Sequence, residues 1–195
     1  MRTTLSNIAR ATLLVANGMI TAQAIAGEQP STAVELTGGR LFQQAAHRLY
    51  ESDETRHEVR SVRVPAKLNR SFKSACSIVF PASHSMVIDG KEYVLVVVNQ
   101  ASSSNPTGFC GVGEEGTLYV LELHDLAAAP RFSLPVQSCL KTIDLRSDGV
   151  KSPYTAISWS ESPSGVRVSW DLDAKGNDAT RTFRYEGGRF VEMAQ

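Results

Sequence analysis

The feature that most limits how this chain folds is a series of short apolar runs separated by turn residues, which begins near residue 58. Residues 85–100 are the clearest example, because Asp89-Gly90 stands between two runs rich in β-branched side chains. Asp-Gly readily adopts the positive φ angles of a two-residue hairpin turn, so this segment predicts a β-hairpin. Residues 93–98 are apolar at every position, which predicts a central strand buried on both faces.

The same pattern continues to the end of the chain. Residues 154–162, 166–173, 180–185 and 189–193 predict four strands, separated by the turn sequences PSG, AKGND and EGG. Trp159 and Trp170 fall on neighbouring strands and are expected to pair across them. Further strands are expected over residues 58–65, 76–80, 116–125 and 131–145, the last of them broken at Pro135. The sequence therefore predicts one mainly β domain over residues 58–195, with about nine or ten antiparallel strands in a sandwich or a blade-like meander.

A different pattern precedes this domain. Residues 27–39 are polar and rich in turn formers, as expected of a loose arm with at most one short strand. Leu41, Ala45 and Leu49 recur at intervals of four residues, with Phe42 and Ala46 beside them. This spacing predicts an N-terminal helix over residues 40–54, so that residues 27–57 form an arm and a helix.

The first 26 residues have the composition of a secretory signal peptide. Arg2 and Arg10 lie in a segment without acids, an apolar run follows, and the small-residue sequence Ala24-Ile25-Ala26 closes it. A membrane anchor is the alternative, but Asn17, Thr21 and Gln23 dilute the apolar run. Cleavage after residue 26 would give an exported, periplasmic protein without a membrane span.

The charge balance limits the choice of partners. The 195 residues carry 20 basic and 20 acidic side chains, and removal of the two arginines would leave 18 basic and 20 acidic. The sequence has no basic stripe, which argues against nucleic acid as the main partner.

The stretch GFCGVGEEG, residues 108–116, contains a literal G-x-G-x-x-G. A dinucleotide-binding loop requires a helix after its glycines, whereas TLYVLEL predicts a strand, and Glu114 and Glu115 would repel phosphate. A catalytic cysteine requires a neighbour that lowers the thiol pKa, and the two acids beside Cys110 oppose this. The remaining interpretation is a loop closed by a disulfide.

Three cysteines, Cys76, Cys110 and Cys139, are available for that disulfide. In an oxidising compartment cysteines pair by default. A Cys110–Cys139 bond is favoured because it ties the loop to the following strand, and a pair that includes Cys76 is the alternative. If Cys76 is the free thiol, its apolar neighbours over residues 78–80 predict that it is buried.

A long loop held by a disulfide is a good candidate for a contact surface. Residues 100–116 supply small hydrogen-bonding side chains, one aromatic anchor and two acids. The residues expected to bind a protein partner are Ser103, Asn105, Phe109, Glu114 and Glu115.

Other chemistry has weaker sequence support. His47, His57, His84 and His124 lack the spacing of a zinc site, and no G-x-S-x-G elbow is present. The segment DLDAKGND has the oxygen ligands of a calcium loop but places Lys175 at a ligand position. An Asx-rich hairpin turn explains the segment equally well. The calcium candidates are Asp171, Asp173, Asn177 and Asp178.

The segments CGVGEEGTLYVLEL, VQSCLKTIDL and TFRYEGGRFV resemble a pattern in small exported proteins of Gram-negative bacteria, some of which resemble periplasmic immunity proteins. This resemblance implies a periplasmic β-rich protein and carries no site residues. The sequence leads to the hypothesis of a non-enzymatic, cofactor-free protein that inhibits a secreted toxin or wall hydrolase of the lysozyme or amidase kind. The alternatives are a periplasmic hydrolase with a dispersed site around His84 or His124, and a calcium-stabilised envelope protein.

Overall fold

The fold is described from a computed structural model, which places residues 32–103, 105 and 107–194. The predicted signal peptide lies outside the described residues. Within them the chain is mainly β, with fourteen strands in three antiparallel sheets, one α-helix and one short 3-10 helix. The mainly β prediction is confirmed, and the expected nine or ten strands were too few.

The N-terminal sheet consists of four strands in chain order, β1 (Ala33–Glu35), β2 (Leu41–Ala45), β3 (Arg48–Asp53) and β4 (Glu58–Val62). The helix predicted for residues 40–54 is therefore wrong, since β2 and β3 form a hairpin there. Ala46 and His47 make its turn with φ angles of 46° and 62°. Phe42 and Leu49 point to the core from the two strands, so the apolar residues fit a hairpin as well as a helix.

The α-helix, α1 (Ala66–Lys73), comes after β4. Pro65 precedes its first turn, where a proline suits a helix start. Leu68 and Phe72, one turn apart, are the buried side chains of α1 and pack with the N-terminal sheet.

The central sheet has five strands, β5 (Ser77–Val79), β6 (Met86–Ile88), β7 (Lys91–Ala101), β8 (Glu114–His124) and β9 (Ala127–Ser138). Its order is β5-β7-β8-β9, and β6 also pairs with β7. The hairpin predicted at Asp89-Gly90 is confirmed, with φ angles of 50° and 73°. The strand expected to break at Pro135 is instead continuous, and its register with β8 shifts beside that proline.

The C-terminal sheet contains β10 (Asp144–Leu145), β11 (Ile157–Glu161), β12 (Ser164–Leu172), β13 (Ala179–Glu186) and β14 (Arg189–Glu192). The short helix η1 (Pro153–Ala156) precedes β11. Strands β11 to β14 form the predicted meander. The predicted pairing of the two tryptophans is wrong, because Trp159 lies opposite Val166 and Trp170 opposite Ala179.

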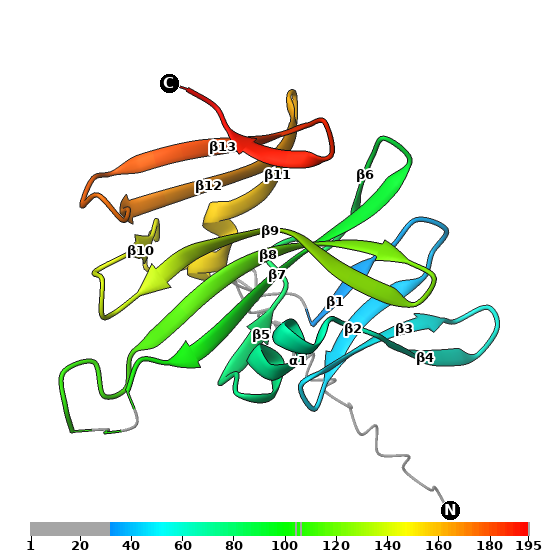
Figure 1. Cartoon of the computed structure of the whole chain (residues 1–195), viewed down its shortest axis with the longest axis horizontal. Helices are drawn as coiled ribbons and strands as arrows, with labels where there is room; N and C mark the ends of the chain where they lie inside the picture. Colours follow the sequence, from blue (N-terminus) through cyan, green and yellow to red (C-terminus); the bar gives the residue numbers. More distant parts are fainter. Residues whose placement is uncertain (1–31, 104, 106, 195) are drawn as a thin grey trace, which may run out of the picture.

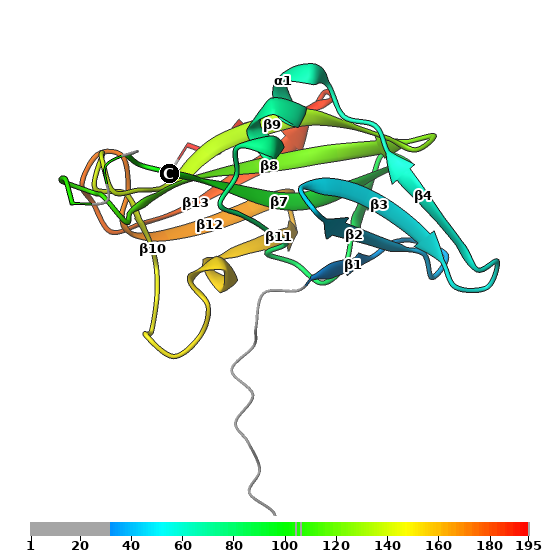
Figure 2. The same cartoon turned by 90° about the horizontal axis from the view of Figure 1, so that it is seen from below.

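Strand β7 is buried on both faces, as residues 93–98 predicted. Val94, Val96 and Val98 belong to a core shared with α1 and the N-terminal sheet. Tyr93, Leu95 and Val97 belong to a second core shared with the C-terminal sheet. Figure 1 shows the long strands of the central sheet between these two outer sheets, and Figure 2 shows α1 and β11 on opposite sides of them.

Two pairs of backbone hydrogen bonds join the N-terminal sheet and the residue after it to residues in or beside strands of the central sheet. At one end Glu35 N–H donates to Ser83 O at 2.8 Å, and Ser85 N–H donates to Glu35 O at 2.9 Å. At the other end Arg63 exchanges hydrogen bonds of 2.8 Å with Leu126 O and Ala128 N–H. These contacts attach the N-terminal sheet to the central part of the chain at two places, in the form of isolated parallel bridges.

Candidate functional site

The candidate site is the end of the molecule where the β7–β8 loop, residues 102–113, is linked to the segment after β9. A disulfide joins Cys110 to Cys139, with an S–S distance of 2.01 Å and a Cα–Cα distance of 5.7 Å. The pairing favoured from the sequence is therefore confirmed. Cys76 is the free cysteine, and it is exposed rather than buried. Its neighbours Ala75 and Ile78 take the inward positions, which leaves the Cys76 side chain facing solvent.

Two of the three glycines in the G-x-G-x-x-G sequence, Gly113 and Gly116, have packing roles. A Cβ atom on Gly113 would stand 2.6 Å from the Cβ of Cys139, so only glycine allows the disulfide to close there without displacement. A Cβ atom on Gly116 would stand 2.8 Å from Oδ1 of the buried Asn99. Strand β8 begins at Glu114, where a dinucleotide-binding loop would require a helix.

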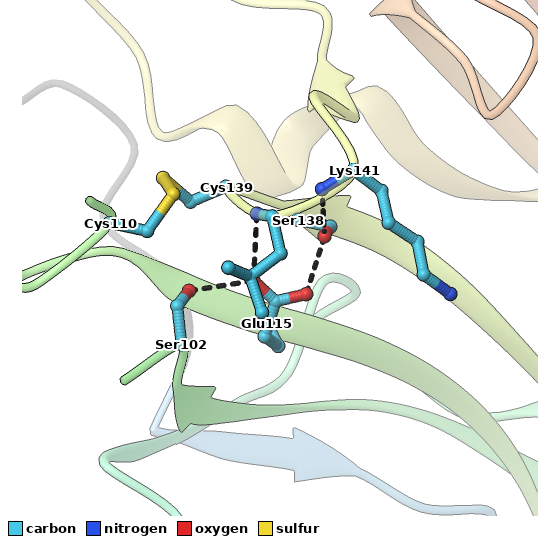
Figure 3. Close-up of a disulfide and its surroundings, with 7 residues drawn as sticks. Ser102, Cys110, Glu115, Ser138, Cys139 and Lys141 are labelled. Carbon is cyan, nitrogen blue, oxygen red and sulfur yellow. Dashed lines mark hydrogen bonds between the residues drawn. A yellow bond between two sulfur atoms is a disulfide. The ribbon is translucent and has the colours of Figure 1, made fainter. Parts of the chain in front are cut away.

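Glu115 connects the segments on either side of the disulfide. Its carboxylate accepts hydrogen bonds from Ser102 Oγ at 2.6 Å, from Leu140 N–H at 3.2 Å, and from Ser138 Oγ. Figure 3 shows this carboxylate between Ser102 and Ser138, close to the disulfide. Burial opposes ionisation of Glu115, but these hydrogen bonds outweigh it and hold the pKa of its carboxyl below the ordinary value. The loop base is thus fixed by a covalent bond and by an ionised side chain.

The five predicted contact residues occupy different parts of this region. Ser103 Oγ accepts a hydrogen bond from Asn105 N–H at 3.0 Å, and Asn105 Oδ1 accepts from Thr107 N–H at 3.2 Å, so both side chains shape the loop. Phe109 projects from the loop with 82% of its surface exposed. Glu114 and Glu115 lie instead at the start of β8, and the oxygens of Glu115 are engaged in the bonds described above.

Sequence reasoning missed two apolar residues beside the disulfide. Val112 is 90% exposed and Leu140 is 53% exposed, next to Gly113 and Cys139 respectively. Together with Phe109 they form what we call the apolar tip, defined as Phe109, Val112 and Leu140. A signal was present in the sequence, because each of the three lies within two residues of a bonded cysteine. Single exposed apolar side chains are ordinary, whereas three of them lie next to one disulfide here, which makes the apolar tip a candidate contact surface.

The calcium candidates make protein contacts of their own. Asp173 is 3% exposed and accepts hydrogen bonds from Lys175 N–H at 2.7 Å and Asn177 N–H at 3.0 Å. Its other oxygen pairs with Arg181, while Asp171 and Asp178 both pair with Arg146. Within the described part of the chain, His, Cys, Asp and Glu side chains form no cluster of three or more suited to a metal ion.

The histidines considered for a hydrolase lie on different segments, His84 before β6 and His124 at the end of β8. His84 is exposed, and its carbonyl accepts a hydrogen bond from Trp159 Nε1 at 3.0 Å. His124 Nε2 lies 2.9 Å from Asp125 Oδ2, and both side chains are more than 80% exposed. Between residues 32 and 194, where described, no histidine side chain is hydrogen-bonded to a serine, threonine or cysteine side chain.

Comparison with protein-family models, with curated proteins and with solved structures gives no match to this chain. No helix in the described ranges is long and apolar enough to span a membrane.

Proposed function

We propose that this protein is an exported binding protein of the immunity or inhibitor type, which blocks a secreted hydrolase by inserting the apolar tip into it. The observation that carries this proposal is the exposure of Phe109, Val112 and Leu140 beside the Cys110–Cys139 bond. A side chain on a fixed support loses little conformational entropy when a partner buries it, so more of its burial energy contributes to affinity.

The charge distribution supports a basic or neutral partner surface. Glu114 lies half-buried at the base of the loop, and Glu115 keeps an ionised carboxylate there. Because the oxygens of Glu115 accept hydrogen bonds from Ser102 in the loop and from Ser138 at the end of β9, Glu115 contributes to the local potential rather than to direct contacts. Such a potential accelerates encounter with a basic cleft, while the apolar tip supplies the contact area.

Two features support export to the periplasm. Residues 1–26 have the order of basic, apolar and small residues expected of a signal peptide. The Cys110–Cys139 disulfide suits an oxidising compartment.

The test is inhibition of peptidoglycan hydrolysis by lysozyme-like and amidase enzymes, including any toxin encoded beside this gene. Wild-type protein should inhibit one of these enzymes, and the double variant Phe109→Ala with Val112→Ser should bind it at least about tenfold more weakly. Val59→Ser is the matched control, because Val59 is 71% exposed on β4 in the N-terminal sheet.

Three outcomes would refute the proposal. The first is that none of the enzymes is inhibited. The second is that the tip variant inhibits as well as wild type. The third is that the protein itself cleaves peptidoglycan, which would favour the hydrolase alternative.

A further inference from the structure

A second surface, separate from the apolar tip, lies beside β11. A groove of about 590 Å³ runs between the segment over residues 81–87 and the strand β11 with η1. Its lining combines aromatic, hydroxyl and charged side chains, among them Ser83, His84, Tyr154, Ser158, Trp159 and Glu161. The hydrogen bond from Trp159 Nε1 to His84 O, 3.0 Å long, connects the two walls and fixes their separation.

One wall of the groove is the edge of a sheet. Strand β11 pairs with β12 on one side, and the described part of the chain supplies no strand on its other side. In a strand, the N–H and C=O of one residue point to the same edge, and successive residues alternate. The N–H of Arg146, which follows β10, donates a hydrogen bond to Ser169 O of β12. The backbone groups of Ser169 therefore point to the side of β12 where β10 and β11 lie. Arg167 and Gly165 face the same side as Ser169, and they lie opposite Ser158 and Ser160 of β11.

This alternation assigns the open edge of β11 to Ile157, Trp159 and Glu161, although the carbonyl of Glu161 already accepts a hydrogen bond from Ser164 Oγ at 3.4 Å. The N–H of Ile157 is taken by Tyr154 O at the end of η1. Among the described residues, the backbone N–H and C=O of Trp159 have no hydrogen-bond partner. Exposed strand edges of this kind recruit further strands, and an antiparallel strand would exchange two hydrogen bonds with Trp159.

The side chains around this edge define what such a strand should carry. Ala82, Met86 and Trp159 are partly exposed and pack against the core between the central and C-terminal sheets. The Trp159 side chain shares its face of β11 with the buried Ile157, so the residue opposite Trp159 would point toward this apolar floor. Glu161 is exposed, and within the described residues its carboxylate has no cationic partner.

We propose that the β11 edge binds an extended peptide segment of a partner protein, added antiparallel to β11. An apolar residue lies opposite Trp159, and a basic residue lies opposite Glu161. The backbone hydrogen bonds provide affinity, and the alternate side chains provide selection, as in other cases of strand addition. The proposal does not depend on the apolar tip, which lies at the disulfide-linked end of the molecule.

The experiment uses purified protein and a fluorescein-labelled peptide of sequence Lys-Thr-Val-Thr-Val-Thr. Antiparallel pairing of its lysine with Glu161 places the first valine opposite Trp159. We expect saturable binding, measured by fluorescence anisotropy. We also expect amide hydrogen exchange at Trp159 and Glu161 to slow by at least about tenfold when the peptide is bound, because both N–H groups face it.

Two controls separate backbone pairing from nonspecific adhesion. N-methylation of the first valine removes its donor, and the affinity should fall at least about tenfold. Glu161→Gln should weaken binding about two- to fivefold at low salt, in keeping with an exposed charge pair. Glu54→Gln, in the exposed β3–β4 turn, should leave binding unchanged.

Three results would overturn the proposal. The first is slow exchange of the Trp159 amide in the protein alone, which would mean that its own chain or a second copy already covers the edge. The second is equal binding of the N-methylated peptide. The third is slowed exchange elsewhere while β11 is unaffected.

Discussion

Gly113 lies directly against Cys139, so that a Cβ atom on the glycine would be 2.6 Å from the Cβ and 2.9 Å from the Sγ of the cysteine. The disulfide and the glycine therefore occupy one close contact between the β7–β8 loop and the segment after β9. This contact, together with Glu115, turns a glycine- and serine-rich loop into a supported surface.

Replacing Gly113 by alanine should destabilise the protein by about 1–3 kcal/mol, because the added methyl group forces the disulfide or the loop to shift. Denaturant unfolding of the oxidised protein measures this free energy. Gly108→Ala is the control, since its Cβ would meet Asn105 at an ordinary 3.5 Å. Equal losses for the two variants would show that the close contact at Cys139 has no special importance.

Cys110→Ser should lower the free energy of unfolding by roughly 3–4 kcal/mol in the chain-entropy model, given that 29 residues separate the bonded cysteines. The same variant should weaken inhibition of a partner hydrolase, because the tip loses its covalent support. Thermal unfolding with and without reductant measures the stability effect. Cys76→Ser, at the exposed free thiol, should unfold as wild type does, and a comparable loss there would argue that the effect is not due to the disulfide.

The stability of the tip should depend on pH through Glu115. Its pKa is lower in the folded protein than the ordinary value of 4.5, so the stabilisation is fully present above that value. It is lost as the pH falls through the folded pKa. Unfolding curves of wild type and Glu115→Gln should therefore differ most at neutral pH and converge in acid. A difference that grew on acidification would contradict the assignment, and Glu54→Gln should follow wild type throughout.

Calcium should have little effect on stability. Asp173 accepts two backbone hydrogen bonds and pairs with Arg181, and Asp171 and Asp178 pair with Arg146, so each of the three carboxylates already has a protein partner. Melting curves with added calcium or with a chelator should agree within about 1 °C. A clear rise in Tm with calcium would favour the calcium-stabilised alternative over the binding protein proposed here.

Local signals identified the parts of the fold that have distinctive turn chemistry. Asp89-Gly90 gave the hairpin, because few other dipeptides accept two positive φ angles. The Ala46-His47 turn also has two positive φ angles, but its sequence is not typical of a hairpin turn. The four-residue spacing of Leu41, Ala45 and Leu49 is that of a helix, although these residues lie in a hairpin. Helix α1 was missed because it buries only Leu68 and Phe72, which leaves a short pattern.

The candidate site was anticipated in part for a similar reason. The Cys110–Cys139 bond was predictable because cysteines pair in an oxidising compartment and because this pair ties the loop to the following strand. The role of Glu115 depends on Ser102 in the β7–β8 loop and on Ser138 at the end of β9, which are too far apart in the chain for one sequence window to contain both. The open edge at Trp159 likewise depends on which strand lies beside β11, and this is a property of the three-dimensional arrangement alone.

The two-sided burial of β7 limits the order in which the cores of the protein can form. Val34, Phe42 and Leu49 are translated before Val94, Val96 and Val98, the residues that cover them. The contact of Arg63 with Leu126 and Ala128 comes later still. The N-terminal sheet is therefore made before the strand that completes its core, so this core closes only once the middle of the sequence is available for folding.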